Sequence, residues 1–175
     1  YLGYNANMMA NEMFLDSADQ RSSVVSLAKQ VGYTTRSATS SQATIDVVVN
    51  TGSGASITMS RGTKFTTTVD GTNYSFVNNA DVSISPQDGV YTFSDLVIYE
   101  GTYLNFKYTA NTTDTDQRFI IPNDNVDTNT LTVKVQESSS DSTTNTYKLA
   151  TGITAIDSTS KVFFLQEVEN GRFEV

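Results

Sequence analysis

The chain has 175 residues, a formal net charge of −8 and no His, Cys or Trp. Without imidazole or thiol groups it cannot perform serine–histidine or cysteine–histidine catalysis or build the common structural zinc sites. The acidic balance opposes binding to nucleic acid and to anionic membrane surfaces, and no stretch approaches the roughly 20 apolar residues of a membrane-spanning helix.

The first 32 residues predict two short helices. Apolar side chains recur at three- and four-residue spacing along the first helix, which includes Met9 and Met13. A break at 15–19, which contains Asp16, Ser17 and Asp19, interrupts this pattern. One apolar stripe on an otherwise polar segment favours a helix that packs on something outside itself.

The second helix is predicted to start after Ser17, because Ser17 and Gln20 have the spacing of a capping box. Gly32 stands where a left-handed cap is required, so the helix should end at Gln30 or Val31. Its predicted inner face consists of Val24, Leu27, Ala28 and Val31.

Strand patterns dominate the sequence after Gly32. A β-branched run at 43–49 predicts a strand, and the Asp70-Gly71 dipeptide predicts a tight hairpin between strands at 63–69 and 73–77. Further strands are predicted at 56–59, 81–85, 90–100, 102–110, 118–121, 131–136, 146–149 and 161–168. Such short strands at regular spacing are typical of an antiparallel β-sandwich or a barrel-like sheet.

These elements predict an α+β fold that is mainly β, with a helical segment at 1–32 and a strand-rich domain at 33–175. The tract 137–145 has no apolar residue and is predicted to be a hairpin tip or an exposed loop. Because the chain starts at Tyr1 and ends within a strand-like pattern at Val175, we expect it to be a fragment of a longer protein.

Acidic residues offer the one route to catalysis that needs no histidine. Glu167 and Glu169 would share one face of a strand, which is most simply a solvated edge and not a catalytic pair. The cluster Asn123–Asp127 has oxygen ligands but lacks the spacing of a calcium-binding loop, so a turn is the better interpretation. We therefore predict no enzyme activity, no metal site and no cofactor.

Aromatic residues alternate along the predicted strands between residues 91 and 108. A platform for stacking on sugars could be formed by Tyr91, Phe93, Tyr99, Tyr103, Phe106 and Tyr108, although two-residue spacing more often marks the core face of a sheet. A carbohydrate- or surface-binding β-sandwich module of a tail fibre or adhesin is therefore the alternative function.

The stretch Asn11–Tyr33 resembles the baseplate wedge subunits (gene product six type) of T-even-type contractile-tailed phages, within the baseplate J-like family. Its most specific part is Arg21-Ser22-Ser23-Val24-Val25 followed by Gly32-Tyr33. Residues 37–39, 60–65 and 119–127 are also similar to that family.

The resemblance implies a structural protein of the tail baseplate, assembled in the host cytoplasm and carried in the virion. It also implies that other baseplate wedge proteins, and a second copy of the chain within the full-length protein, are the partners. The residues predicted to bind a partner are Met9, Met13, Val24, Leu27 and Val31, and the alternative is that they pack against the chain's own sheet.

Overall fold

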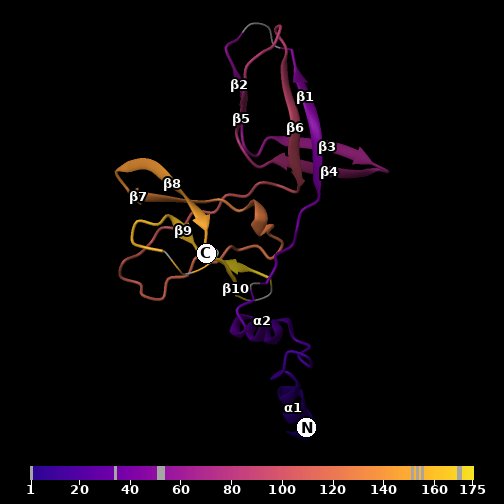
Figure 1. The fold of residues 1–175 in the computed structure, drawn as a ribbon. Helices are drawn as coiled ribbons and strands as arrows, with labels where there is room; N and C mark the ends of the chain where they lie inside the picture. The colour runs from indigo at the N-terminus through magenta and orange to yellow at the C-terminus, as the bar shows by residue number, and fades with distance from the viewer. Residues whose placement is uncertain are drawn as a thin grey trace. The chain divides into compact units, whose positions relative to one another are not determined.

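The computed structural model describes residues 2–33, 35–50, 54–150, 152, 154, 156–168 and 171–175. Two N-terminal helices precede mostly antiparallel sheets, which confirms the predicted α+β, mainly β class (Figure 1). The chain forms two compact units, one of residues 1–38 with 107–175 and the other of residues 39–106. These boundaries differ from the predicted ranges 1–32 and 33–175. Residues 39–106 form the second unit, and residues 107–175 belong to the same unit as the N-terminal helices.

The unit of residues 39–106 contains a four-stranded antiparallel sheet in the order β1-β6-β4-β3. Its strands are β1 (Gln42–Val49), β3 (Lys64–Val69), β4 (Thr72–Asn78) and β6 (Tyr91–Glu100). A separate antiparallel pair consists of β2 (Ile57–Met59) and β5 (Val82–Ile84). The strands predicted at 43–49, 63–69, 73–77 and 90–100 are confirmed within one or two residues.

A bulge in β6 explains how this unit fills its core. The β1–β6 register shifts beside Asp46, where Asp95 adopts a positive φ of 53° and donates its backbone N–H to the Asp46 carboxylate at 2.8 Å. An extra residue in a strand reverses which later side chains face inward. The buried side chains of β6 are accordingly Tyr91, Phe93, Leu96 and Ile98, two on each side of the bulge.

The predicted Asp70-Gly71 hairpin is confirmed. Both residues have positive φ, 49° and 79°, as a type I′ turn requires, and β3 pairs with β4 without interruption from Lys64 with Val77 to Val69 with Thr72. Only residues 76–78 of β4 pair with β6. The tip of the hairpin therefore projects beyond the sheet, across the direction of β1 and β6 (Figure 1).

The other unit contains both helices, α1 (Leu2–Asn11) and α2 (Arg21–Gln30), and the 3-10 turn η1 (Thr128–Thr130). Its strands are β7 (Val133–Ser138), β8 (Asp141–Leu149), β9 (Val162–Phe163), β10 (Gln166–Glu167) and β11 (Phe173–Glu174). Strand β8 pairs antiparallel with β7 and parallel with β9, and β10 pairs antiparallel with β11.

Two predicted strands are wrong, because alternating apolar residues form a strand only where another strand offers hydrogen bonds. Residues 102–110 form no strand within the described part of the chain, and residues 118–121 contribute only a single bridge, between Ile120 and Glu174. The polar tract 137–145 is exposed as predicted, apart from the half-buried Asn145, but its turn is limited to Ser139-Ser140. The rest of the tract belongs to β7 and β8.

Candidate protein interface

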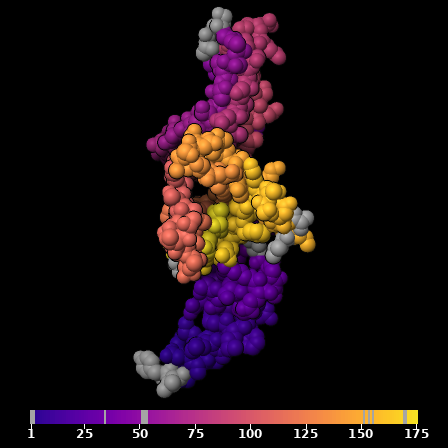
Figure 2. Space-filling model, turned by 90° about the vertical axis from the view of Figure 1, so that its left-hand side faces the viewer, coloured from indigo at the N-terminus to yellow at the C-terminus, as the bar shows by residue number. Residues whose placement is uncertain are grey.

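Helix α1 exposes all its side chains from Gly3 to Asn11, and it contains no charged residue. Large apolar side chains continue into the turn that follows, with exposed fractions of 76% for Tyr4, 73% for Met9 and 66% for Phe14. We call residues 4–15 the N-terminal apolar segment. The space-filling view shows its atoms, in indigo, at the surface (Figure 2). A ten-residue helix is marginal in water without packing, so this segment has the properties of a surface that binds a partner.

The side chains that α2 buries differ from those predicted. Val25 and Ala28 are 5% and 7% exposed, whereas Val31 is 74% exposed. The prediction that Ala28 lies on the buried face is confirmed. Val25, which was not predicted, is buried, whereas Val24 is only half-buried. The helix ends at Gln30 as predicted, and Gly32 adopts a φ of 78° in a cap where Tyr33 N–H donates to the Ala28 carbonyl.

An ion pair joins α2 to β10. Arg21 Nε donates to Glu167 Oε1 at 2.7 Å and Arg21 Nη2 donates to Glu167 Oε2 at 3.0 Å. The Glu167 side chain is 1% exposed and the Arg21 side chain 60% exposed. The prediction that Glu167 lies on a solvated edge is therefore wrong, because a partner 146 residues away in the sequence lets the carboxylate be buried as an ion.

Burial raises the pKa of the Glu167 carboxyl, but the hydrogen bonds and the positive charge of Arg21 outweigh it. The net result is a pKa below the ordinary glutamate value. Glu167 is thus ionised at neutral pH and is committed to a structural contact. This arrangement gives α2 a fixed attachment, and the N-terminal apolar segment precedes it along the chain.

Glu12 connects the end of α1 to the start of α2. Its carboxylate accepts hydrogen bonds from the Asp19 and Gln20 backbone N–H groups at 3.1–3.3 Å, and a hydrogen bond from the Ser23 side chain is the main cause of a lowered pKa. The predicted capping box is wrong, because Ser17 Oγ donates instead to the Asn11 carbonyl at 2.6 Å. Glu12 supplies the acceptor that unpaired amides at a helix start require.

The five residues predicted to bind a partner lie in three settings. Met9 is exposed in α1, and Met13, 69% exposed, lies two residues beyond its end. Val24 and Leu27 are half-buried in α2, and Val31 is exposed at its C-cap. The sequence pattern missed Tyr4, Phe14 and Leu15, because they fall outside the three- and four-residue spacing used to find the stripe.

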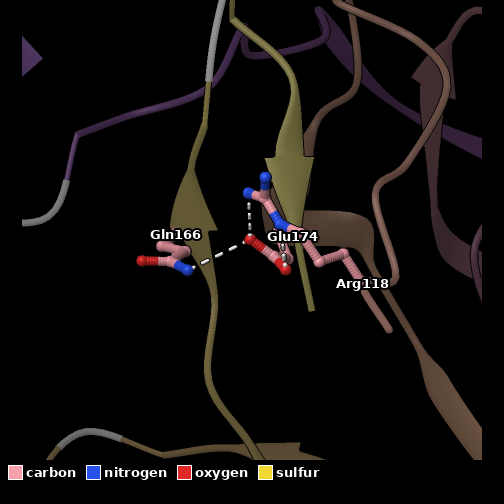
Figure 3. A network of polar contacts seen from close by, with 3 residues as sticks. All are labelled: Arg118, Gln166 and Glu174. Carbon is pink, nitrogen blue, oxygen red and sulfur yellow. Dashed lines mark hydrogen bonds and ion pairs between the residues drawn. The ribbon is translucent and has the colours of Figure 1, made fainter. Parts of the chain in front are cut away.

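Glu174, on the strand that pairs with β10, is also held by an arginine. Glu174 of β11 accepts from Arg118 Nε and Nη2 at 2.9 and 2.7 Å and from Gln166 Nε2 at 3.1 Å (Figure 3). The Arg118 hydrogen bonds hold the pKa of Glu174 below its ordinary value despite partial desolvation. Glu169, which the sequence places on the same strand face as Glu167, lies outside the described residues.

The acidic turn at residues 123–127 serves its own backbone, as predicted. Asn123 Oδ1 accepts from the Asn125 N–H at 2.8 Å, and Asp127 Oδ1 accepts from the Asn129 N–H at 3.0 Å, where it caps η1. No group of three or more acidic residues within the described ranges has a geometry suited to a metal ion.

The aromatic residues proposed as a sugar platform do not share one exposed face. Tyr91 is fully buried and donates its hydroxyl to the Gly54 carbonyl at 2.8 Å, and Tyr99 is half-buried. Tyr103 is 45% exposed, and the Arg61 guanidinium lies 4.6 Å from its ring centroid. The burial of Tyr91 and Phe93 confirms that these alternating aromatic residues form the core face of the sheet. Tyr103 is exposed and does not belong to this core.

Comparison with models of known protein families gives no match. Comparison with curated protein sequences gives none either. Within the described residues, neither helix has the length and apolar character needed to cross a membrane.

Proposed function

We propose that the chain is a structural component of a contractile phage tail baseplate wedge and acts through protein–protein assembly. The N-terminal apolar segment is the observation that carries this proposal, because large apolar side chains gathered on an uncharged surface helix mark contact sites for other proteins. Residues 11–33, which overlap this segment, resemble baseplate wedge subunits, and this resemblance is the reason for proposing the baseplate as the assembly. The proposed location is the tail baseplate of the virion.

The chemistry of this segment favours helix packing over charge recognition. Residues 2–11 carry no charge, so affinity has to come from burying side chains such as Tyr4, Met9 and Phe14. An apolar groove or a helix of another wedge protein fits this requirement. Met13 extends the same surface, and Val24, Leu27 and Val31 on α2 remain proposed contributors.

A structural role also agrees with the state of the buried and half-buried carboxylates. Glu167 and Glu174 are each paired with an arginine and held in the ionised form. A general acid in catalysis needs a raised pKa, and neither group has one. We therefore propose no catalytic step for this chain.

The second candidate is a carbohydrate-binding module, and the exposed Tyr103 is the observation that favours it. Its ring is backed by Arg61 and lies against Gly62, where an added Cβ would be 3.4 Å from the ring. A glycan-array signal that disappears in Tyr103→Ala would support this function. The burial of Tyr91 and Phe93 removes two of the aromatic rings that were candidates for the platform.

Co-expression with the wedge proteins encoded by neighbouring genes tests the proposed function. The tagged chain should retain a wedge protein through washing, and a Met9→Ser, Phe14→Ser double variant should lose it. Val48→Ser is the matched control, because Val48 is a 58% exposed apolar residue of β1 outside the segment. Retention by the double variant, or equal loss from the control, would contradict the proposal.

A further inference from the structure

Three polar side chains form a continuous chain of hydrogen bonds across the sheet β7-β8-β9 (Figure 1). Lys161 Nζ donates to Asn145 Oδ1 at 2.6 Å, and Asn145 Nδ2 donates to Glu137 Oε1 at 2.7 Å. Glu137 belongs to β7, Asn145 belongs to β8, and Lys161 directly precedes β9. The sheet therefore brings together an amine, a carboxamide and a carboxylate from three separate segments.

The carboxamide of Asn145 is held in one orientation. A carboxylate only accepts hydrogen bonds and an ammonium only donates them, so the amide nitrogen has to face Glu137 and the amide oxygen has to face Lys161. Asn145 is half-buried and lies opposite Val135 in the β7–β8 ladder, so its side chain is on the half-buried face of these strands. Packing and hydrogen bonds together fix the amide next to the amine.

The amine lies within reach of the amide carbon. A C=O bond is about 1.23 Å long and a hydrogen bond commonly meets the oxygen at an angle of about 120°, so the 2.6 Å contact places Lys161 Nζ about 3.4 Å from Asn145 Cγ. Reacting atoms about 3–3.5 Å apart correspond to a near-attack arrangement, in which two groups react as if at very high concentration. Attack then requires only that the amine move from the lone pair of the oxygen to the face of the carbonyl group.

We propose that Lys161 and Asn145 join through an intramolecular isopeptide bond, with Glu137 transferring the proton. Lys161 loses a proton to water, and the neutral amine attacks Asn145 Cγ. In the resulting tetrahedral intermediate both nitrogens are attached to one carbon, so the carboxylate beside Nδ2 takes a proton from the attacking nitrogen and gives it to the leaving one. The Cγ–Nδ2 bond then breaks and ammonia leaves. One amide replaces another, so no electrons are gained or lost and no co-reactant is consumed.

The cross-link closes a loop between residues 145 and 161 and attaches β9 covalently to β8. Strand β9 consists only of Val162 and Phe163, so its parallel pairing with β8 is short. Closing a loop of about 15 residues restricts the unfolded chain and thereby stabilises the fold. The reaction occurs once in each molecule and uses no outside substrate, so it is a self-modification and not enzyme turnover. It depends neither on the N-terminal apolar segment nor on the baseplate assignment.

Mass spectrometry of the full chain tests the proposal, because release of ammonia lowers the mass by about 17 Da. Only an uncharged amine attacks, so the fraction with the lower mass should grow faster at pH 9 than at pH 7. Tryptic mapping should then show the peptide that contains Asn145 joined to the one that contains Lys161. A cyclic imide at an asparagine also loses ammonia, but it joins no peptides. Absence of the joined peptide after a week at pH 9 would overturn the proposal.

Three variants test the roles of the side chains. Lys161→Arg keeps a cation beside Asn145 but has no nucleophilic amine, so the joined peptide should be absent. Lys148→Arg is the matched control, because Lys148 is an exposed lysine of β8, and it should cross-link like the wild type. Glu137→Gln keeps an acceptor for the amide N–H but cannot carry the proton, so cross-linking should slow about a hundredfold. A joined peptide in Lys161→Arg, its absence in Lys148→Arg, or an unchanged rate in Glu137→Gln would overturn the proposal.

Discussion

Replacing Arg21 with Gln should destabilise the unit that contains both helices, because it leaves the buried Glu167 carboxylate without its partner. Glu167 is 1% exposed, and removing one member of a fully buried pair costs about 3–5 kcal/mol. Arg21 is 60% exposed, however, so water screens the pair and replaces part of the lost contact. We therefore expect a loss of about 2 kcal/mol in the free energy of unfolding.

The assay is urea unfolding followed by far-UV circular dichroism at pH 7 and at pH 4. The Glu167 pKa is lowered in the folded chain, so the ion pair stabilises the fold above the ordinary value of 4.5, and this contribution is lost as the pH falls further through the folded pKa. The difference between wild type and Arg21→Gln should therefore be largest at pH 7 and smaller below pH 4.5.

Arg118→Gln is the matched control. Arg118 makes the same two-pronged contact, but its partner Glu174 is 14% exposed, so the expected loss is about 1 kcal/mol or less. The double variant Arg21→Gln, Glu167→Gln should recover part of the stability, because no buried charge is left unpaired. Equal losses for Arg21→Gln and Arg118→Gln, or a loss for Arg21→Gln that does not depend on pH, would show that the Arg21–Glu167 ion pair does not stabilise the fold as a buried pair.

Three further predictions concern the β-rich parts of the chain. Gly71→Ala should lower stability by about 1–2 kcal/mol, because the position has a φ of 79°, and a thermal melt that shifts no more than that of Gly3→Ala would contradict this. Tyr91→Phe should cost about 1 kcal/mol through loss of the hydrogen bond to the Gly54 carbonyl, measured by urea unfolding; an unchanged midpoint would mean that the bond contributes nothing. Deleting residues 138–145 should lower the melting temperature, because these residues pair in β7 and β8, whereas Asn-Gly in place of Ser139-Ser140 should not lower it.

Local chemistry made much of the fold predictable. The Asp70-Gly71 turn and the Gly32 cap depend on residues that accept positive φ, and both features appear where expected. The strand at 43–49 follows from β-branched residues alone. Features that depend on distant parts of the chain were not predictable. Sequence periodicity does not reveal the bulge at Asp95. Because of this bulge, Leu96 and Ile98 face the core on the same side of β6 as Tyr91 and Phe93.

The candidate site shows the same limit. The apolar character of Met9 and Met13 was visible in the sequence, and both are exposed. The buried state of Glu167 depends on Arg21, which lies far away in the chain, and no spacing rule relates the two residues. The strand predicted at 102–110 has suitable alternation, but pairing depends on a neighbour that the segment's own sequence cannot specify.

Hydrogen exchange over residues 2–15 shows whether the N-terminal apolar segment is the assembly surface. In the free chain α1 packs none of its side chains from residue 3 onward, so its amides should exchange at nearly unprotected rates. In the complex with a co-expressed wedge protein the same amides should become protected about a hundredfold or more, while those of β6 should change little. Strong protection of residues 2–15 that is already present in the free chain, or exchange that is unchanged in the complex, would contradict the claim that this segment is the assembly surface.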